Sequence, residues 1–167
     1  MSQLFPDLPT LDQHAEEIAD FASWRDGYGV IRHSSATQAA VYRLAHRLVE
    51  KGQQTDLASV YQQMRALDLL TSAGLWLVVH MTYARRLRPD GSPLTAEDFK
   101  PQPEGHTGGA LNMVPGYAAY LAINSLSGQT RSWLMGQGHC VAAIDALNVL
   151  TGNLHPQQAE RYSGEAG

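Results

Sequence analysis

The chain has 167 residues, which is enough for one domain with a sizeable hydrophobic core. Only 17% of the residues are charged, the formal net charge is −4 and no Lys/Arg-rich run is present, so general nucleic-acid binding is disfavoured. The single cysteine, Cys140, cannot form an internal disulfide and is typical of a reducing compartment. Because the first residues lack a basic start and a continuous apolar run, we expect no signal peptide and a cytoplasmic location.

After a proline-containing arm, apolar residues at helical spacing predict a series of helices. In chain order these helices span residues 11 to 24, 36 to 51, 56 to 87, 112 to 127 and 139 to 150. Thr95 is expected to cap the short turn TAEDF, and Asn112 to cap the fourth helix with Pro115 in its first turn. The proline-rich stretch KPQPEG, residues 100 to 105, is expected to run extended.

The third predicted helix contains an apolar segment, residues 66 to 84, that nearly reaches membrane-spanning length. It carries Asp68, Ser72 and His80, whose polar groups cost much more in a bilayer core than in a protein interior. We therefore predict a buried helix and no membrane partner. The chain's only basic cluster follows, and consists of Arg85, Arg86 and Arg88. At a helix end, such a cluster most often complements the helix dipole.

Two segments have the composition of strands. RSWLMG, residues 131 to 136, is short, apolar and ended by glycine, and YGVIRH, residues 28 to 33, is a weaker candidate. Alternating helices with one or two strands predict an α/β class that is mostly helical. A buried strand needs hydrogen-bonding neighbours, so the remaining strands would follow on a longer chain or come from a partner. The chain is thus expected to be the incomplete opening portion of an α/β domain.

Seven histidines are present, and two of them lie in glycine-framed loops immediately before predicted helices. His106 is in GHTGG and His139 is in GQGHC. Flanking glycines let a backbone approach a ligand and leave an imidazole uncrowded, and a neutral imidazole can both donate to and accept from a sugar hydroxyl or carbonyl. The alternative is that the glycines only make tight turns and the histidines only cap helices. Zinc is a further alternative, through His106, His139, Cys140 or His155, although no paired ligand spacing supports it.

Two stretches resemble a known family: LTAEDFKPQPEGHTGGALNMVPGYAAYLAIN and, after the predicted strand, GQGHCVAAIDALNVLTGN. They are similar to the N-terminal thiamine-diphosphate domain of phosphoketolases and, more distantly, to transketolases. The matching positions are Lys100, Pro101, Gly105, His106, Gly109, Leu111, Asn112, Tyr120, Asn124 and the segment 136 to 139. Two departures concern neighbours of the histidines. Thr107 stands where the family usually has an aromatic residue, and Cys140 and Val141 stand where it has glycines.

The resemblance implies a truncated, transketolase-like thiamine-diphosphate domain over residues 56 to 160. Residues 1 to 55 form a helical extension outside it, and 161 to 167 form a tail. It also implies cleavage of the C2–C3 bond of a ketose phosphate in carbohydrate metabolism, with thiamine diphosphate as electron sink. His106 and His139 would be the catalytic residues, hydrogen-bonding donor oxygens and moving protons. The substrate-binding residues would be Gly105, Gly109, Asn112 and Gly138.

The family's magnesium and diphosphate motif is missing from this chain. The resemblance therefore implies that thiamine diphosphate and Mg²⁺ belong to the complete enzyme, and that this chain alone binds neither tightly and is inactive. The missing C-terminal domains or a partner subunit would complete the site, and we expect homo-oligomerisation because an incomplete sheet leaves apolar surface exposed. The alternative is a non-catalytic remnant that acts as an interaction or assembly module.

Overall fold

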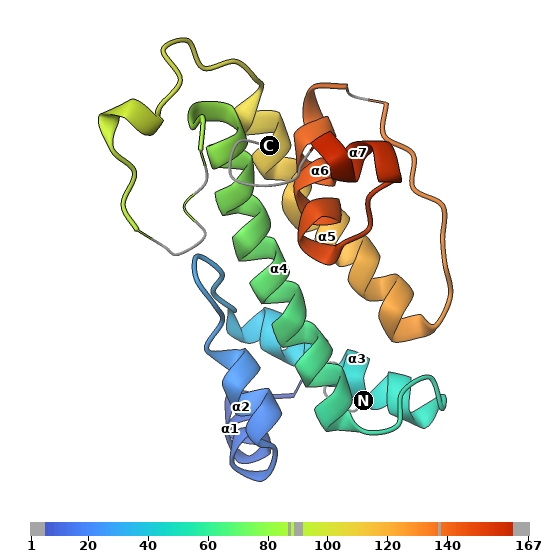
Figure 1. Cartoon of the computed structure of the whole chain (residues 1–167). Coiled ribbons are helices and arrows are strands. Elements are labelled where there is room, and N and C mark those ends of the chain that lie inside the picture. Colours follow the sequence, from blue (N-terminus) through green and yellow to red (C-terminus); the bar gives the residue numbers. More distant parts are fainter. Residues whose placement is uncertain (1–5, 87, 89–91, 137, 162–167) are drawn as a thin grey trace. The chain divides into compact units, whose positions relative to one another are not determined.

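A computed structural model describes residues 6–86, 88, 92–136 and 138–161, and the regular elements of these residues are all helical (Figure 1). In chain order they are α1 (Leu8–Glu17), α2 (Ala19–Arg25), α3 (Ser35–Glu50), α4 (Leu57–Tyr83), the 3-10 turn η1 (Ala96–Asp98), α5 (Thr107–Ser127), the 3-10 turn η2 (Gly138–Cys140), α6 (Val141–Thr151) and α7 (Pro156–Arg161). The prediction of a mostly helical chain is confirmed.

The predicted strands are wrong for the part of the chain that the structure describes. Residues 131 to 136 and 28 to 33 have no strand structure, and the β-type pairing present is an isolated antiparallel bridge between Ala84 and Phe99. The start of the segment 131 to 136 is held by side chains of α5 instead. The backbone N–H of Arg131 donates to Asn124 and its carbonyl accepts from the Tyr120 hydroxyl. Leu134 is 95% exposed, so no burial favours a strand there.

The described residues form two compact units, and both α4 and α5 contribute to each of them. The first unit contains Met1–Ser72 and Ala119–Ser132, and the second contains Ala73–Ala118 and Trp133–Gly167. The core of the first unit is built from α1, α2, α3, α4 and the end of α5. Its buried apolar residues are Leu11, Phe21, Trp24, Ala39, Val41, Ala45, Leu48, Val60, Tyr61 and Leu126.

The helix predicted over residues 11 to 24 is divided into α1 and α2 at Ile18. This residue is extended, with φ −126° and ψ 101°, while the next helix starts directly after it. Ile18 packs against the core of the first unit, and its β-branched side chain has a lowered helix propensity. By contrast, α3 agrees with its prediction to within one residue at each end, because the Ser34 hydroxyl caps it by accepting from the Thr37 N–H.

In the second unit, α5 begins at Thr107 rather than at Asn112, so the predicted cap is wrong and Pro115 lies inside the helix. Proline has no N–H to donate to the carbonyl four residues earlier, which weakens a helix interior. Ala110, Val114 and Tyr117 are buried at helical spacing, and this burial offsets the weak helix propensity of the preceding glycines. The helix α6 agrees closely with its prediction, and Gly152 ends it in the left-handed conformation at φ 68°.

The third predicted helix corresponds to α4, which ends at Tyr83, before the predicted end at residue 87. Residue 87 itself lies outside the described residues. Among the described residues, no helix combines the length and the apolar character needed to cross a bilayer. The cap of the short turn is confirmed, because Thr95 and Asp98 form a reciprocal capping box around η1.

Candidate functional site

His106 and His139 lie side by side in the second unit, although 33 residues separate them in sequence. His106 directly precedes α5 and His139 lies in η2, directly before α6. Their ring centroids are 4.7 Å apart, with an angle of 64° between the ring planes, which is an edge-to-face arrangement. Both residues are exposed. The structure therefore brings the two predicted histidines together on one open surface.

Gly109 allows this close arrangement, because it lies in the first turn of α5 beneath both rings. A Cβ atom at this position would lie 2.8 Å from Cδ2 of His139, 2.9 Å from Cδ2 of His106 and 3.3 Å from the sulfur of the buried Cys140. All three separations are shorter than an ordinary van der Waals contact, and the two to the histidine rings are the shortest. Any side chain larger than hydrogen would therefore displace a ring, as expected for a glycine that clears space around a histidine.

The other predicted substrate-binding residues differ in what the structure shows for them. Gly105 has a φ of 134°, a conformation that residues with a side chain rarely adopt, so it sets the turn that leads into His106. A Cβ atom on Gly138 would meet no atom within 4 Å, so packing does not require glycine there. Asn112 is exposed on α5 and does not cap it. The binding roles of these residues stay predictions.

Lys100, which belongs to the family-like motif with Pro101, holds the preceding loop against the end of α4. The Lys100 ammonium donates to the carbonyl of Met81 at 2.6 Å, and its backbone N–H donates to the carbonyl of Tyr83 at 2.9 Å. The first of these contacts satisfies a carbonyl of the last helical turn and places a positive charge at the negative end of the helix dipole. Lys100 thus has a structural role that positions the segment leading to His106.

The chemistry available at the histidine pair is hydrogen bonding and proton transfer. Two imidazoles at this separation can contact neighbouring oxygens of one small molecule, each as donor or acceptor. Within the described residues, no group of three His, Cys, Asp or Glu side chains is arranged to hold a metal ion. The hydrogen-bonding capacity of the two imidazoles matches a polar organic ligand with adjacent oxygens.

A second histidine-containing cluster, which the sequence did not identify as a site, lies inside the first unit. His33 Nε2 is 2.8 Å from a carboxylate oxygen of Asp68, both side chains are nearly buried, and the His33 ring stacks on Trp24 with centroids 4.4 Å apart. Burial raises the pKa of Asp68, and the hydrogen bond from His33 opposes this rise. The sequence feature that could have indicated this cluster is Asp68, an aspartate within an otherwise apolar helical segment. A carboxylate buried in such a segment requires a polar partner elsewhere in the fold.

The same core contains His14, which is 2.8 Å from the Tyr61 hydroxyl. Its ring contacts those of Phe21 and Tyr42 edge-on, with centroids 4.8 Å and 4.7 Å away. Burial lowers the pKa of His14, and the neighbouring His46 lowers it further. These contacts tie α1 to α3 and α4, which indicates a structural role for this histidine.

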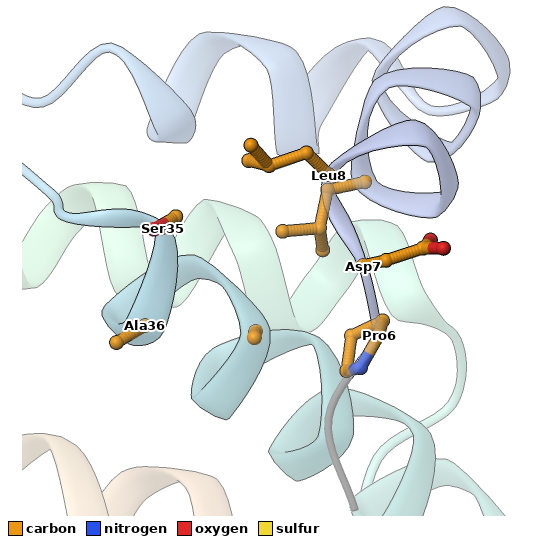
Figure 2. A pocket seen from close by; sticks show the side chains of 7 residues that line it. Pro6, Asp7, Leu8, Ser35 and Ala36 are labelled. Atoms are coloured by element: carbon orange, nitrogen blue, oxygen red, sulfur yellow. The ribbon is translucent and has the colours of Figure 1, made fainter. Parts of the chain in front are cut away.

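A hollow of about 350 Å³ lies at the beginnings of α1 and α3, and Figure 2 shows the side chains that line it. Its lining is mostly apolar and comprises Pro6, Asp7, Leu8, Leu11, Ser35, Ala36 and Ala39. The Asp7 carboxylate caps α1 by accepting from the backbone N–H and the hydroxyl of Thr10. Among the described lining residues Asp7 is the one ionisable group, and it is already used in this way. The histidine pair is therefore the stronger candidate site.

Comparisons of this chain with protein-family models, with curated proteins and with solved structures found no match.

Proposed function

We propose that this chain is an N-terminal fragment or subunit of a thiamine-diphosphate-dependent, phosphoketolase-like enzyme that cleaves the C2–C3 bond of a ketose phosphate. The proposal rests on one observation: the two glycine-histidine motifs that resemble the family's motifs meet in space, with ring centroids 4.7 Å apart. The glycine shared with the family motif, Gly109, lies where an added side chain would collide with both rings.

In this proposal His106 and His139 contact the donor oxygens of the sugar. Each imidazole stabilises a hydroxyl or carbonyl oxygen by a hydrogen bond and moves a proton to or from it as charge develops. Gly105 sets the position of His106, and Cys140 packs below the pair through Gly109. Asn112 and Gly138 are proposed to contribute polar backbone or side-chain contacts at the edge of the same surface.

The described residues do not fit the inorganic part of the cofactor. Mg²⁺ prefers several oxygen ligands, and no group of three potential ligand side chains is arranged for a metal within the described ranges. The ligands for Mg²⁺ and the diphosphate are therefore proposed to come from the missing C-terminal domains or from a partner subunit. We expect the isolated chain to bind thiamine diphosphate weakly or not at all. Micromolar affinity by calorimetry would contradict this division of the site.

The direct test is a turnover assay with xylulose 5-phosphate, thiamine diphosphate, Mg²⁺ and inorganic phosphate, measuring formation of acetyl phosphate. The full chain is assayed alone and together with the products of its neighbouring genes. We expect turnover only in the combined sample, and a loss of about 100-fold or more in H106N and in H139N, since proton transfer by one positioned group contributes this much. H155N, in an exposed histidine beside α7, is the matched control.

The outcomes separate the parts of the proposal. Turnover that is unchanged in both H106N and H139N would refute the assignment of the histidine pair. Absence of turnover in every combination, with folded protein, would refute the enzymatic proposal itself.

The second candidate function is a non-catalytic interaction or assembly module, and the exposed apolar side chains favour it. Besides Leu134, the second unit exposes Trp76, Phe99 and Val141 by more than a third of their surface. Apolar groups of this size in contact with water favour association. Sedimentation at increasing concentration is expected to show self-association, and a clean monomer at high concentration would count against this candidate.

A further inference from the structure

The three arginines that follow α4 line a pocket in the second unit, of about 530 Å³, together with the loop that ends in η1. Its lining consists of Arg85, Arg86, Arg88, Thr95, Glu97 and Asp98. These arginines are the chain's only basic cluster, in a protein whose formal net charge is −4. The cluster was expected to complement the dipole of the preceding helix.

The contacts at the end of α4 show that another residue has this role. The Lys100 ammonium donates to the carbonyl of Met81 in the last turn of α4. The Arg85 guanidinium instead donates to the carbonyl of Glu97 at 2.7 Å, and the backbone N–H of Arg85 donates to the carbonyl of Asp98. The Arg85 side chain is therefore directed to η1 and not to a carbonyl of α4, and Arg86 lines the pocket beside it.

One of the two carboxylates that line the pocket, that of Asp98, is already paired with one of the three arginines. Asp98 is buried, and its Oδ2 atom accepts from the Arg88 guanidinium at 2.6 Å and from the N–H and hydroxyl of Thr95 at 2.8 Å and 3.0 Å. The hydrogen bond from the Thr95 N–H, followed by that from Arg88, lowers the pKa of Asp98 to about 2, so it stays ionised and neutralises Arg88.

Two guanidinium groups remain, those of Arg85 and Arg86, against one carboxylate, that of Glu97. Within the described part of the chain, neither arginine forms an ion pair with a carboxylate. Arg85 uses one nitrogen for the Glu97 carbonyl and has further donors available, since a guanidinium carries five N–H groups. Among its described lining residues, the pocket thus has an excess of positive charge and unused donors beside a preformed hollow.

We propose that this pocket binds the phosphate group of a small phosphorylated ligand, with Arg85 and Arg86 as its donors. Guanidinium groups match phosphate oxygens with paired N–H···O bonds and keep their charge at every physiological pH. The fixed Arg88–Asp98 pair holds the wall of the pocket and Thr95 adds a hydroxyl. The proposal is independent of the enzymatic function above, because it is tested by binding and not by turnover.

The test is an NMR titration of the full chain with three probes: inorganic phosphate, xylulose 5-phosphate and free xylulose, each against chloride at equal ionic strength. Saturable shifts at residues 85 to 98 are expected with the two phosphate-containing probes and not with xylulose. Tighter binding of the sugar phosphate identifies a phosphate ester as the ligand, whereas equal or tighter binding of inorganic phosphate identifies the free ion. Absence of saturable binding by both, or equal shifts with chloride, overturns the proposal.

Three substitutions make the test specific. R86Q is expected to weaken phosphate binding by about tenfold, since it removes a charged donor. R65Q removes a positive charge from another exposed arginine, in the part of α4 that belongs to the first unit, and is expected to leave binding unchanged. E97Q removes the competing negative charge but keeps the carbonyl that holds Arg85, so it is expected to tighten binding several-fold. Equal effects of R86Q and R65Q, or weaker binding in E97Q, would also overturn the proposal.

Discussion

Replacing Gly109 by alanine separates two effects that oppose one another, helix propensity and packing against the histidine pair. Within a helix, alanine in place of glycine stabilises by about 0.5 to 1 kcal/mol. At Gly109 the added Cβ would lie 2.8 Å and 2.9 Å from the two histidine rings and 3.3 Å from the Cys140 sulfur. Overpacking of this kind typically costs about 1 to 3 kcal/mol. We therefore expect G109A to range from neutral to about 2.5 kcal/mol less stable.

Gly116 is the matched control, because it lies in the interior of the same helix and its nearest neighbour, a methionine sulfur, would be 4.0 Å from an added Cβ. G116A receives the propensity gain without the overlap, which corresponds to a rise in Tm of about 1 to 4 °C. The difference between the two variants is then the cost of the overlap alone, about 1 to 3 kcal/mol in urea or thermal unfolding.

A second readout is needed because both histidine rings are exposed and could swing away from the new methyl group. In that case the stability cost would be small, but the nuclear Overhauser contact between the rings of His106 and His139 would be lost. G109A is thus expected to lose stability relative to G116A, or to lose the ring contact, or both. If G109A is as stable as G116A and also keeps the contact between the rings, the close packing around Gly109 is refuted.

Three further predictions concern the first unit. Burial lowers the pKa of His14 in the folded chain, so the unfolded chain binds more protons at this residue. The free energy of unfolding should therefore fall as the pH drops below about 6.5. H14Q should flatten this pH dependence when it is measured by urea unfolding. D68A leaves the buried His33 without its partner and should lower the free energy of unfolding by about 3 kcal/mol. In a double-mutant cycle, D68A combined with H33A should cost less than the sum of the two single substitutions. S34A should cost about 1 kcal/mol by removing the cap of α3, whereas S35A, in the exposed next residue, should cost little.

The helices that the sequence predicts well are those whose ends carry local signals. The cap of α3 at Ser34 and the left-handed glycine at the end of α6 act through backbone groups a few residues away, so a short window of sequence contains the information. The break at Ile18 and the early start of α5 depend instead on which residues the rest of the fold buries. Ala110 and Val114 extend α5 through glycines that local propensity disfavours.

The segment 131 to 136 shows the same limit for strands. A short apolar run has no periodicity that separates a buried strand from an irregular, exposed connection, and only neighbouring strands could decide between them. Its pairing partners would be distant in sequence or on another chain. The candidate site was more predictable, because the glycines framing His106 and His139 are local. The His33–Asp68 pair joins residues 35 apart, and no local pattern links them.

The pairing of the two histidines does not depend on the strand that was expected to lead into His139. Helix packing in the second unit brings the loops together: Gly74 of α4 would place a Cβ 2.6 Å from Leu147 and 3.1 Å from Val114, so α4, α5 and α6 approach closely there. The Tyr117 hydroxyl also donates to Asn148, which joins α5 to α6 at a second point. The histidine pair is therefore formed by the helices of this chain, without the strand that the sequence predicted. For this reason the G109A experiment tests the arrangement of the pair in this chain alone, whereas the turnover assay tests the proposed function.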